Sequence, residues 1–524
     1  MSYQTAQRQK LTNNVWVFSG GMVDNVQNVD LAWQYSPYLR NARLDGQSII
    51  IRPWHQLFKE LASGDYPRGI WRYLRANPAN NVMVIRHNVD ATHKLYTLTA
   101  SWTLTSIATG ADIASDNRMH FTNIADDVYC MNWVDDIGIL NGTTYTTPSF
   151  GIASFAPAFS CVFDSKHRAS GWSANSNKVY YSAVNDYDGF GMAGSWQLTF
   201  QEQITGLVSN GQAIFYFSNN SISLTGLGDI QDSWGTLYYV SRALQSSEWA
   251  PCNASIVAAG SNVYFLSSSN SICMIAPWNN VNGFEVIELS DRPYAGISKL
   301  MGTLDADQSD SFGYFLPDEM IIKWHLKLAG STINDIVVVY DITKDKFLVD
   351  DRKFFYGGVY FEGKNYTISM LEPKVYEDEY SQDDEGWAIP FEYHTKEFYI
   401  SDPTFKKILW ESRTLVDINE LAECTQEIYI DWVAQDSKTI DSDNIPVATS
   451  GIATLTVGEE AIGEWALDDE YKETYILRTK WNLNKKGRKF QWRWYNASLA
   501  GKVRLKDLSV KAEICPAEAT NLTA

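Results

Sequence analysis

A strand–turn–strand unit that recurs along the chain limits its possible folds more than any other feature. The clearest copy, at 205–228, reads TGLVSNGQAIFYFSNNSISLTGLG. Residues 213–217 form an unbroken apolar and aromatic run, 218–220 read Ser-Asn-Asn, and 221–224 alternate polar and apolar side chains. A period of two is typical of a half-buried β-strand, and Asn tolerates the positive φ of tight turns. We therefore predict strands and turns here and no helix.

A second copy, SIVAAGSNVYFLSSSNSICMIA at 255–276, repeats the same order of small-residue turn, aromatic strand, Ser/Asn turn and Ser-Ile alternation. Similar sets of strands recur between 69 and 375. A period of about 40 to 50 residues is typical of β-propellers, in which each sheet buries its apolar faces against its neighbours. We predict an all-β fold with a propeller of six or seven blades at 46–376. A pair of stacked β-sandwiches is the alternative.

Ring closure in propellers often borrows a strand from the other end of the chain. Residues 47–58 contain the strand-like run Ile49-Ile50-Ile51, and we expect this segment to close the ring beside 365–371. The preceding residues, 1–45, are expected to form an N-terminal arm, with a short strand (VWVFSGG) within 14–21 and a polar stretch with few apolar anchors at 25–38.

The character of the chain changes after the propeller. Residues 377–386 begin EDEYSQDDE, which predicts an exposed acidic linker; a calcium site is the alternative, since clustered carboxylates suit that ion. From 387 to 515 the strands are longer and alternate, which predicts a C-terminal β-sandwich. Residues 516–524 are expected to be a flexible tail.

The net charge and the cysteine spacing limit the classes of protein to which this chain can belong. The 62 acidic residues outnumber the 43 Lys and Arg residues and give a net charge of −19, which argues against a general nucleic-acid binder. The six cysteines are scattered without paired spacing, so we expect free thiols in a protein that folds in the cytosol. No signal peptide and no run of 18 apolar residues is found, so no membrane span is expected.

Catalytic motifs are missing from the sequence. It contains no GxSxG, HExxH, GxxxxGK[ST] or GxGxxG pattern, and none of the SxDxGxxW boxes of sialidase propellers. Nothing singles out a carboxylate pair for glycoside cleavage. We therefore predict no enzymatic activity, no cofactor and no metal site.

A basic island between Trp481 and Trp494 interrupts the acidic composition. Its cations, expected on a hairpin tip beside three Trp residues, are Lys485, Lys486, Arg488, Lys489 and Arg493. The functional interpretation is a contact to phosphate, to lipid headgroups or to an acidic neighbouring subunit. The alternative is a solvated hairpin whose Trp residues face the sandwich core.

The order of several weak motifs resembles one known family. These are SPYLRNARLDG, III-R-P, KLYTL, ILNGTTY, KVYYSAVNDYDGF, the two repeat copies, INDIVVVYDITKDKFLVDD and FEYHTKEFYISDPTFKKILWES. In this order, over about 35–415, the chain resembles the β-propeller tail nozzle, hub or "stabilisation" proteins of short-tailed double-stranded DNA phages. The sandwich region is less clearly covered.

The resemblance implies a virion component, assembled in the host cytoplasm, that forms a six-membered ring at the distal tail. Such a ring lies below an adaptor ring, surrounds the DNA channel, retains the genome until ejection, and offers docking surfaces for tail fibres or a plug. A negative lumen would let DNA pass without strong contacts. The chain is compact, so large inserted domains of longer relatives are not expected, which leaves fibre docking open.

Two other classes of function stay open. A tail-tip adaptor or receptor-binding protein would present an outward aromatic groove that holds sugar. A polysaccharide-degrading propeller would carry convergent carboxylates near its central funnel. For the nozzle, the predicted gate loops are 185–195 and 303–311, both polar and rich in turns, with the carboxylates Asp186, Asp188, Asp305, Asp307 and Asp310.

Overall fold

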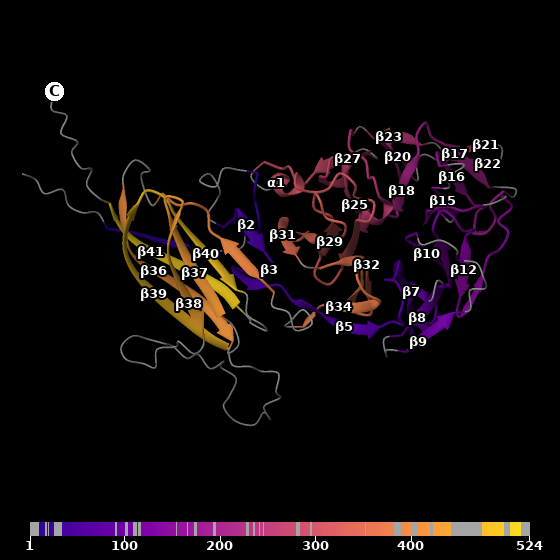
Figure 1. Cartoon of the computed structure of the whole chain (residues 1–524). Helices are drawn as coiled ribbons and strands as arrows, with labels where there is room; N and C mark the ends of the chain where they lie inside the picture. Colours follow the sequence, from indigo (N-terminus) through magenta and orange to yellow (C-terminus); the bar gives the residue numbers. More distant parts are fainter. Residues whose placement is uncertain are drawn as a thin grey trace, which may run out of the picture.

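The computed structural model of the chain is almost entirely β-structure, arranged as two parts that lie side by side (Figure 1). The structure describes residues 10–514 except for short gaps and one long one. The gaps are 16–17, 19, 26–33, 90–91, 100–102, 108–112, 114–116, 153–154, 165, 172–175, 192–194, 227–229, 234–235, 240, 245, 279–282, 294–295, 352, 382–388, 400–405, 420–422, 442–473 and 497–502.

The larger part is a β-propeller, in which seven four-stranded antiparallel sheets can be counted among the described residues. The expectation of six or seven blades is thereby confirmed. The first three blades are β6 (Gly69–Tyr73), β7 (Val82–Val89), β8 (Thr92–Leu98) and β9 (Leu104–Ile107); β10 (His120–Ile124), β11 (Asp127–Met131), β12 (Gly138–Asn141) and β13 (Thr144–Thr146); and β14 (Phe159–Phe163), β15 (Lys166–Ser170), β16 (Lys178–Tyr181) and β17 (Trp196–Thr199).

The fourth blade carries an inserted hairpin, β21 (Ile230–Ser233) and β22 (Thr236–Tyr239), before its outer strand. Short helical turns η2 (Pro78–Asn80), η5 (Asn253–Ser255) and α1 (Ser298–Met301) lie in connections. The strands of blades four to six are β18 (Ile204–Ser209), β19 (Ala213–Ser218), β20 (Ser221–Gly226) and β23 (Arg242–Leu244); β24 (Val257–Ala259), β25 (Asn262–Leu266), β26 (Ile272–Trp278) and β27 (Gly283–Glu288); and β28 (Phe312–Leu316), β29 (Ile321–Leu326), β30 (Ile336–Asp341) and β31 (Lys346–Asp351).

The repeat unit folds as its sequence predicts. Every side chain of β19 is buried, and β20 pairs with it across a turn in which Asn220 has a φ of 73°. Asn is among the few residues that adopt this left-handed conformation at low cost. The aromatic run therefore lies inside a blade, and the alternating run forms the next strand of the same sheet.

The seventh blade closes the ring with a strand from the N-terminal side. It contains β32 (Phe355–Phe361), β33 (Lys364–Ser369) and β34 (Lys374–Ser381), and β5 (Trp54–Glu60) pairs antiparallel with β34. The innermost strand of each blade contacts that of the next, and β32 contacts β6 to complete the circle.

The predicted closure segment, 47–58, is therefore only partly right. Its first half belongs to β4 (Ser48–Ile51), which pairs in the second part of the molecule, and its second half belongs to β5. The partner of β5 is β34 and not the expected 365–371. Pro53 separates the two strands, and a proline cannot donate a hydrogen bond to a ladder.

The second part is a β-sandwich of two antiparallel sheets. One sheet has the order β3 (Ala42–Asp45), β4, β41 (Val503–Ile514), β36 (Lys407–Asn419) and β39 (Thr474–Gly487), and β1 (Lys10–Val15) also pairs with β41. The other has the order β2 (Tyr38–Arg40), β35 (Phe391–His394), β40 (Phe490–Asn496), β37 (Glu423–Ile430) and β38 (Val433–Asp441).

Residues 1–45 are thus not simply an arm, because β1, β2 and β3 supply strands to both sheets of the sandwich. The sequence did not show this, since the partners of these short strands lie hundreds of residues away. The predicted sandwich at 387–515 is present but incomplete without them.

The acidic linker is also corrected. Residues 377–381 lie in β34, and Glu377 and Asp378 are buried. A run of carboxylates usually indicates solvent exposure, but here cations from other strands neutralise them inside the protein, as described below. Residues 382–386, and the predicted tail at 516–524, lie outside the described residues.

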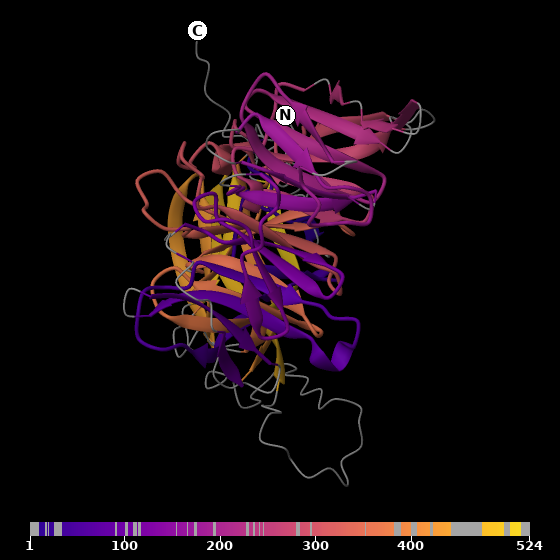
Figure 2. The ribbon, with the colours of Figure 1, turned by 90° about the vertical axis from the view of Figure 1, so that its right-hand side faces the viewer.

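Propeller and sandwich share one hydrophobic core. The largest buried cluster runs without a break from blades five and six (Tyr264, Trp324, Phe347) into the sandwich (Phe391, Trp494). Phe18 packs edge-on against Tyr393, at 5.4 Å between ring centres, and Met22 donates its backbone N–H to Phe347 (2.9 Å). Viewed from the propeller side, the propeller sheets lie in front of the sandwich (Figure 2).

Candidate functional site

A cavity lies at the centre of the propeller, between the innermost strands of the blades, and is called the tunnel below. It has a volume of about 680 Å³ and is lined by residues of all seven innermost strands, from β6 to β32. The half-buried rings of Trp71 and Tyr360 lie on its wall, and Trp71 donates its indole N–H to Asn123 (3.0 Å). The tunnel is the concave site in which a propeller of this kind can hold a small molecule.

The charged side chains on the described part of the tunnel wall are positive. Among the described residues that line it, the charged side chains are Arg72 and Arg118. Arg118 donates to the carbonyls of Asp310, Ser311 and Tyr356 (2.6, 2.8 and 3.0 Å), and its guanidinium lies 4.1 Å from the centre of the Tyr356 ring. The convergent carboxylates that a polysaccharide-degrading propeller requires are not found among these described lining residues.

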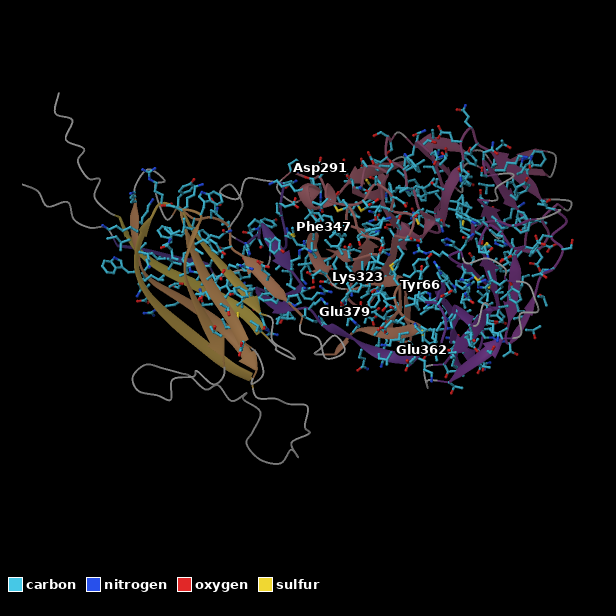
Figure 3. All side chains as sticks on the ribbon, viewed as in Figure 1. Tyr66, Asp291, Lys323, Phe347, Glu362 and Glu379 are labelled. Atoms are coloured by element: carbon cyan, nitrogen blue, oxygen red, sulfur yellow. The ribbon has the colours of Figure 1, made fainter. Side chains whose placement is uncertain are left out.

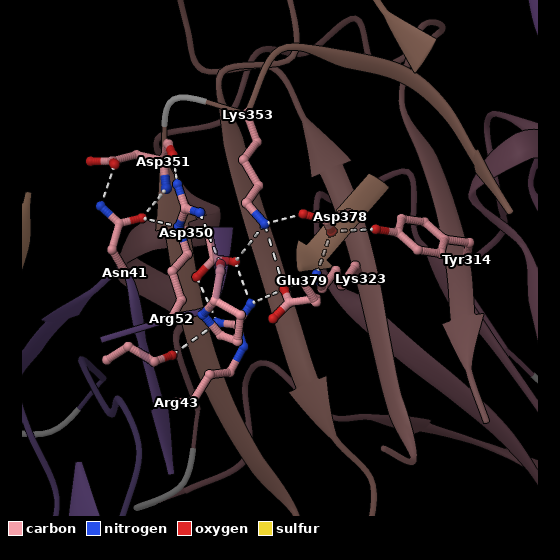
Figure 4. Close-up of polar contacts among 12 residues, drawn as sticks. Asn41, Arg43, Arg52, Tyr314, Lys323, Asp350, Asp351, Lys353, Asp378 and Glu379 are labelled. Carbon is pink, nitrogen blue, oxygen red and sulfur yellow. Dashed lines mark hydrogen bonds and ion pairs between the residues drawn. The ribbon is translucent and has the colours of Figure 1, made fainter. Parts of the chain in front are cut away.

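A buried ion network lies where blade six, blade seven and the sandwich meet (Figures 3 and 4). Arg43 of β3 donates two hydrogen bonds to Asp350 of β31 (2.8 and 2.7 Å) and one to Glu379 of β34 (2.7 Å). Lys323 of β29 pairs with Asp378 (2.6 Å) and with Glu379. These strands come from three different sheets, so the network ties the sheets together.

Lys353 and Tyr314 complete the charged centre. The Lys353 ammonium lies 2.5 Å from Asp378 and 3.5 Å from Glu379, and the Tyr314 hydroxyl donates to Asp378 (2.9 Å). The side chains of Lys323, Lys353 and Asp378 are completely buried. Buried charges are tolerated only when they are paired and hydrogen-bonded, which is the case here.

A polar extension joins this centre to the sandwich. Asn41 donates to the Asp351 carboxylate (2.5 Å) and to the Pro390 carbonyl (2.9 Å), while its own side-chain oxygen accepts from the Arg52 Nε (3.0 Å). With Arg52 and Asp351 included, four cations face four carboxylates. The network is therefore close to neutral in a chain of net charge −19.

The pKa values of the network reflect this pairing. Burial alone would raise the pKa of Asp350, but the charges of Arg43 and Lys353 more than offset it, and the pKa falls below its usual range. Asp378 behaves in the same way between Lys323 and Lys353. Burial lowers the pKa of Lys353, whereas for Lys323 the attraction of Asp378 and Glu379 outweighs burial and raises it. Both carboxylates stay ionised at neutral pH.

Sequence reasoning missed this network. Two signals are present in the sequence: the acidic run at 377–379, which resembles an exposed linker, and Lys323 in the apolar run MIIKWHL. A lysine in a strand that is otherwise buried implies a buried carboxylate partner. The identity of that partner, 55 residues away, could not be read from the sequence.

The basic island folds differently from the expected hairpin. Its two strands, β39 and β40, belong to opposite sheets, so the turn between them crosses the sandwich. Trp492 and Trp494 are fully buried, as the core alternative predicted, whereas the side chain of Trp481 lies outside the described residues. The turn connects two sheets because β39 and β40 each bury their apolar side chains from a different sheet of the sandwich.

The five predicted contact cations differ in their partners and in their exposure to solvent. Arg493 pairs with Glu392 and Glu427 (2.7 and 3.2 Å), and Lys489 pairs with Glu397 (3.2 Å). Lys486 and Arg488 are exposed, and Lys485 is half-buried. The structure thus brings Lys486, Arg488 and Lys489 together at one turn and gives Arg493 internal partners.

The five predicted gate carboxylates do not line the propeller tunnel. Tyr129 donates its hydroxyl to Asp188, and Asp186 is exposed in the same loop. Asp305 and Asp307 lie 4.0 and 3.5 Å from the Lys327 ammonium, whereas Asp310 accepts from Arg118 through its backbone carbonyl. Only the backbone of Asp310 thus contacts the tunnel wall. Whether either loop gates a channel between subunits stays a prediction.

Metal and thiol chemistry find little support in the described part of the chain. No group of three or more His, Cys, Asp or Glu side chains is placed there to hold a metal ion. Five of the six cysteines are described, and each is a free thiol. Burial raises the pKa of the Cys161 thiol, on the tunnel wall, to about 12, so the thiol is protonated at neutral pH. None of the described helices is long and apolar enough to cross a membrane.

Fold and site together define the chain as an all-β protein in which a seven-bladed propeller is fused to a β-sandwich. No protein-family model matches the sequence, and no curated protein matches it. Solved structures with a similar fold include YCF48 bound to D1 peptide (11% identity, 62% of this chain and 95% of that chain, TM-score 0.39). Virginiamycin B lyase from Staphylococcus aureus (10%, 62% and 98%, 0.40) and the designed protein Ika8 (10%, 67% and 98%, 0.37) are others. At these identities the similarity concerns the fold alone.

Proposed function

We propose that the chain is a structural protein of a phage tail, a nozzle or hub that forms a six-membered ring around the DNA channel. The ring retains the genome in the virion and gives it passage during ejection. Its partners are further copies of the chain, an adaptor ring on the portal side, tail fibres or a plug, and DNA that passes without sequence-specific contact. It carries out no catalysis and binds no cofactor.

The observation that carries this proposal is the continuous core between propeller and sandwich. A shared apolar cluster and a buried ion network join the two parts, which is the kind of contact that resists their separation under load. A ring that holds packaged DNA under pressure needs subunits whose parts are joined in this way. The net charge of −19 also suits a channel that repels phosphate.

The experiment is a deletion of the chain from assembling particles. We expect heads that package DNA but lose it, and tails that lack their distal ring in electron micrographs; adding the purified chain should restore both. Particles that keep their DNA and an unchanged tail tip without the chain would contradict the proposal.

The tunnel supports a second candidate, a tail-tip protein that holds a glycan. Trp71 and Tyr360 offer aromatic faces in a cavity of about 680 Å³, which is the chemistry that stacks on sugar rings. A Trp71→Ala variant that loses binding to host polysaccharide, while the tail ring persists, would favour this candidate. Equal binding of the polysaccharide by the wild type and the Trp71→Ala variant would contradict the glycan-binding candidate.

A further inference from the structure

Two exposed Trp-Val pairs are unusual features of the surface. Trp432 and Val433 are 67% and 60% exposed, and Trp133 and Val134 are both 54% exposed. Both Trp residues have a left-handed backbone, with φ of 74° and 65°. A bulky residue in this conformation is strained, and strained positions gather at functional sites. Each pair thus combines exposed apolar side chains with a bulky residue at a turn position where Gly, Asn or Asp is preferred.

The first pair belongs to a basic sandwich patch, which we define as Trp432, Val433, Lys486, Arg488 and Lys489. Lys486 and Arg488 are its exposed cations, and Lys489 is paired with Glu397 (3.2 Å). Trp432 is the second residue of a two-residue turn between β37 and β38, at which Ile430 pairs with Val433. The Lys489 ammonium lies 4.5 Å from the centre of the Trp432 ring.

The basic sandwich patch is held in place by Asp431. Its carboxylate accepts hydrogen bonds from the backbone of Arg488 and Lys489 (3.0 and 2.9 Å), so the two turns are clasped together. The patch therefore presents its aromatic ring and its cations in a fixed arrangement.

The second pair belongs to an acidic propeller patch, which we define as Trp133, Val134, Asp135 and Asp136. It lies between β11 and β12 of blade two. Asn132 fixes this turn, because its side-chain oxygen accepts from the backbone of Val134 and Asp135 (3.2 and 2.9 Å) and its amide donates to the Asp135 carboxylate (2.6 Å). Asp136 is exposed.

The two patches are complementary and lie far apart in one molecule. The basic patch lies at the end of the sandwich where β41 leads to the C-terminus, as Lys407 pairs with both Gly487 and Ile514. Blade two, with β10 and β12, lies on the side of the propeller away from the sandwich (Figure 1). The separation prevents one chain from joining its own two patches.

We propose that the basic sandwich patch of one copy docks on the acidic propeller patch of a second copy. Opposite charge sets the register, and the Trp and Val side chains of both patches supply apolar contact. A head-to-tail contact of this kind leaves one free patch at each end of a dimer, so it closes into a ring or grows into a filament. The inference rests on the proposed ring and names the contact that builds it.

A charge exchange tests the contact, with mass measured by light scattering. We expect Arg488→Glu and Asp136→Lys each to shift the assembled wild-type chain to monomers, and the double variant to restore the wild-type mass. Arg242→Glu, which makes the same change of charge at an exposed position of blade four outside both patches, should assemble normally. A single variant that still assembles, or a double variant that stays monomeric, would overturn the contact.

A Trp432→Gly variant separates binding from folding. Glycine adopts the left-handed conformation without strain, so the melting temperature should rise while assembly is lost. A variant that assembles like the wild type overturns the inference and leaves the proposed function intact. A wild-type chain that is monomeric in solution and absent from particle tails contradicts both.

Discussion

At the scale of single residues, the folded protein depends on charges and imidazoles that water does not reach. His325 of β29 is fully buried and stacks on Phe312, with ring centres 4.5 Å apart and ring planes 5° apart. Burial lowers the pKa of His325 to about 3. His167 is also fully buried, and its pKa is lowered to about 3 for the same reason. Such residues make folding sensitive to acid.

The first prediction concerns His325→Phe. An unfolded histidine takes up a proton below about pH 6.5, but the folded one does not until about pH 3, so its contribution is complete above pH 6.5 and is lost as pH falls. Between these limits the wild type should lose about 1.4 kcal/mol of unfolding free energy per pH unit more than the variant.

Urea midpoints at pH 7 and pH 5 measure this difference. His394→Gln, at a partly exposed histidine of the sandwich, is the control. Parallel pH dependence in the wild type and the His325 variant would show that this imidazole takes a proton in the folded state.

The second prediction concerns Asp378→Asn. The change removes one of the two carboxylates, Asp378 and Glu379, that Lys323 and Lys353 share in a buried site. Removing one partner of a buried ion pair costs about 3–5 kcal/mol of unfolding free energy. Arg504→Gln, which breaks the exposed pair with Asp45, should cost less than about 1 kcal/mol. Equal losses from both variants, in denaturant titrations at pH 7, would mean that the network adds nothing beyond a surface pair.

At the scale of elements, strand β5 decides whether the ring of blades is closed. Phe58 of β5 is buried in one cluster with Ile70 and Met83 of blade one and Val359 of blade seven. Its ring meets Tyr366 at 4.6 Å between centres. A single side chain therefore joins the first and last blades.

The third prediction follows from this position. Phe58→Ala should lower the unfolding free energy by about 3–5 kcal/mol, because the lost contacts leave a cavity between two blades. Leu57→Ala, at a 38%-exposed neighbour in the same strand, should change it by less than about 0.5 kcal/mol. Urea titration and the rate of proteolytic cleavage at β5 measure both effects. A loss of unfolding free energy as small as that of Leu57→Ala would show that Phe58 does not stabilise the contact between the first and last blades.

Sequence patterns predicted local elements well and distant pairings poorly. The strands at β19, β20, β25 and β26 follow from their own residues, because period-two alternation and turn-forming Asn act over a few positions. Strand β1 pairs with β41, with Lys10 in register with Glu513, and nothing within KLTNNV indicates that partner. The buried ion network could not be predicted for the same reason, because Arg43 binds carboxylates that follow it by 307 and 336 positions in the sequence.

At the scale of the whole molecule, propeller and sandwich are joined through one buried core. The N-terminal strands enter the sandwich, the chain then closes the propeller through β5, and it returns to the sandwich after β34. The buried ion network and the shared core lie at this crossing. A joint of this kind can carry load in a ring, as the proposed nozzle requires.

The most direct measurement is the number and position of copies in the assembled virion, obtained by electron microscopy of intact particles with symmetry assigned at the tail tip. The account predicts six copies in one ring, around an open channel, with the sandwich of each subunit against the propeller of the next. A tail tip without this chain, or one with the chain as separate copies on the fibres, would contradict it.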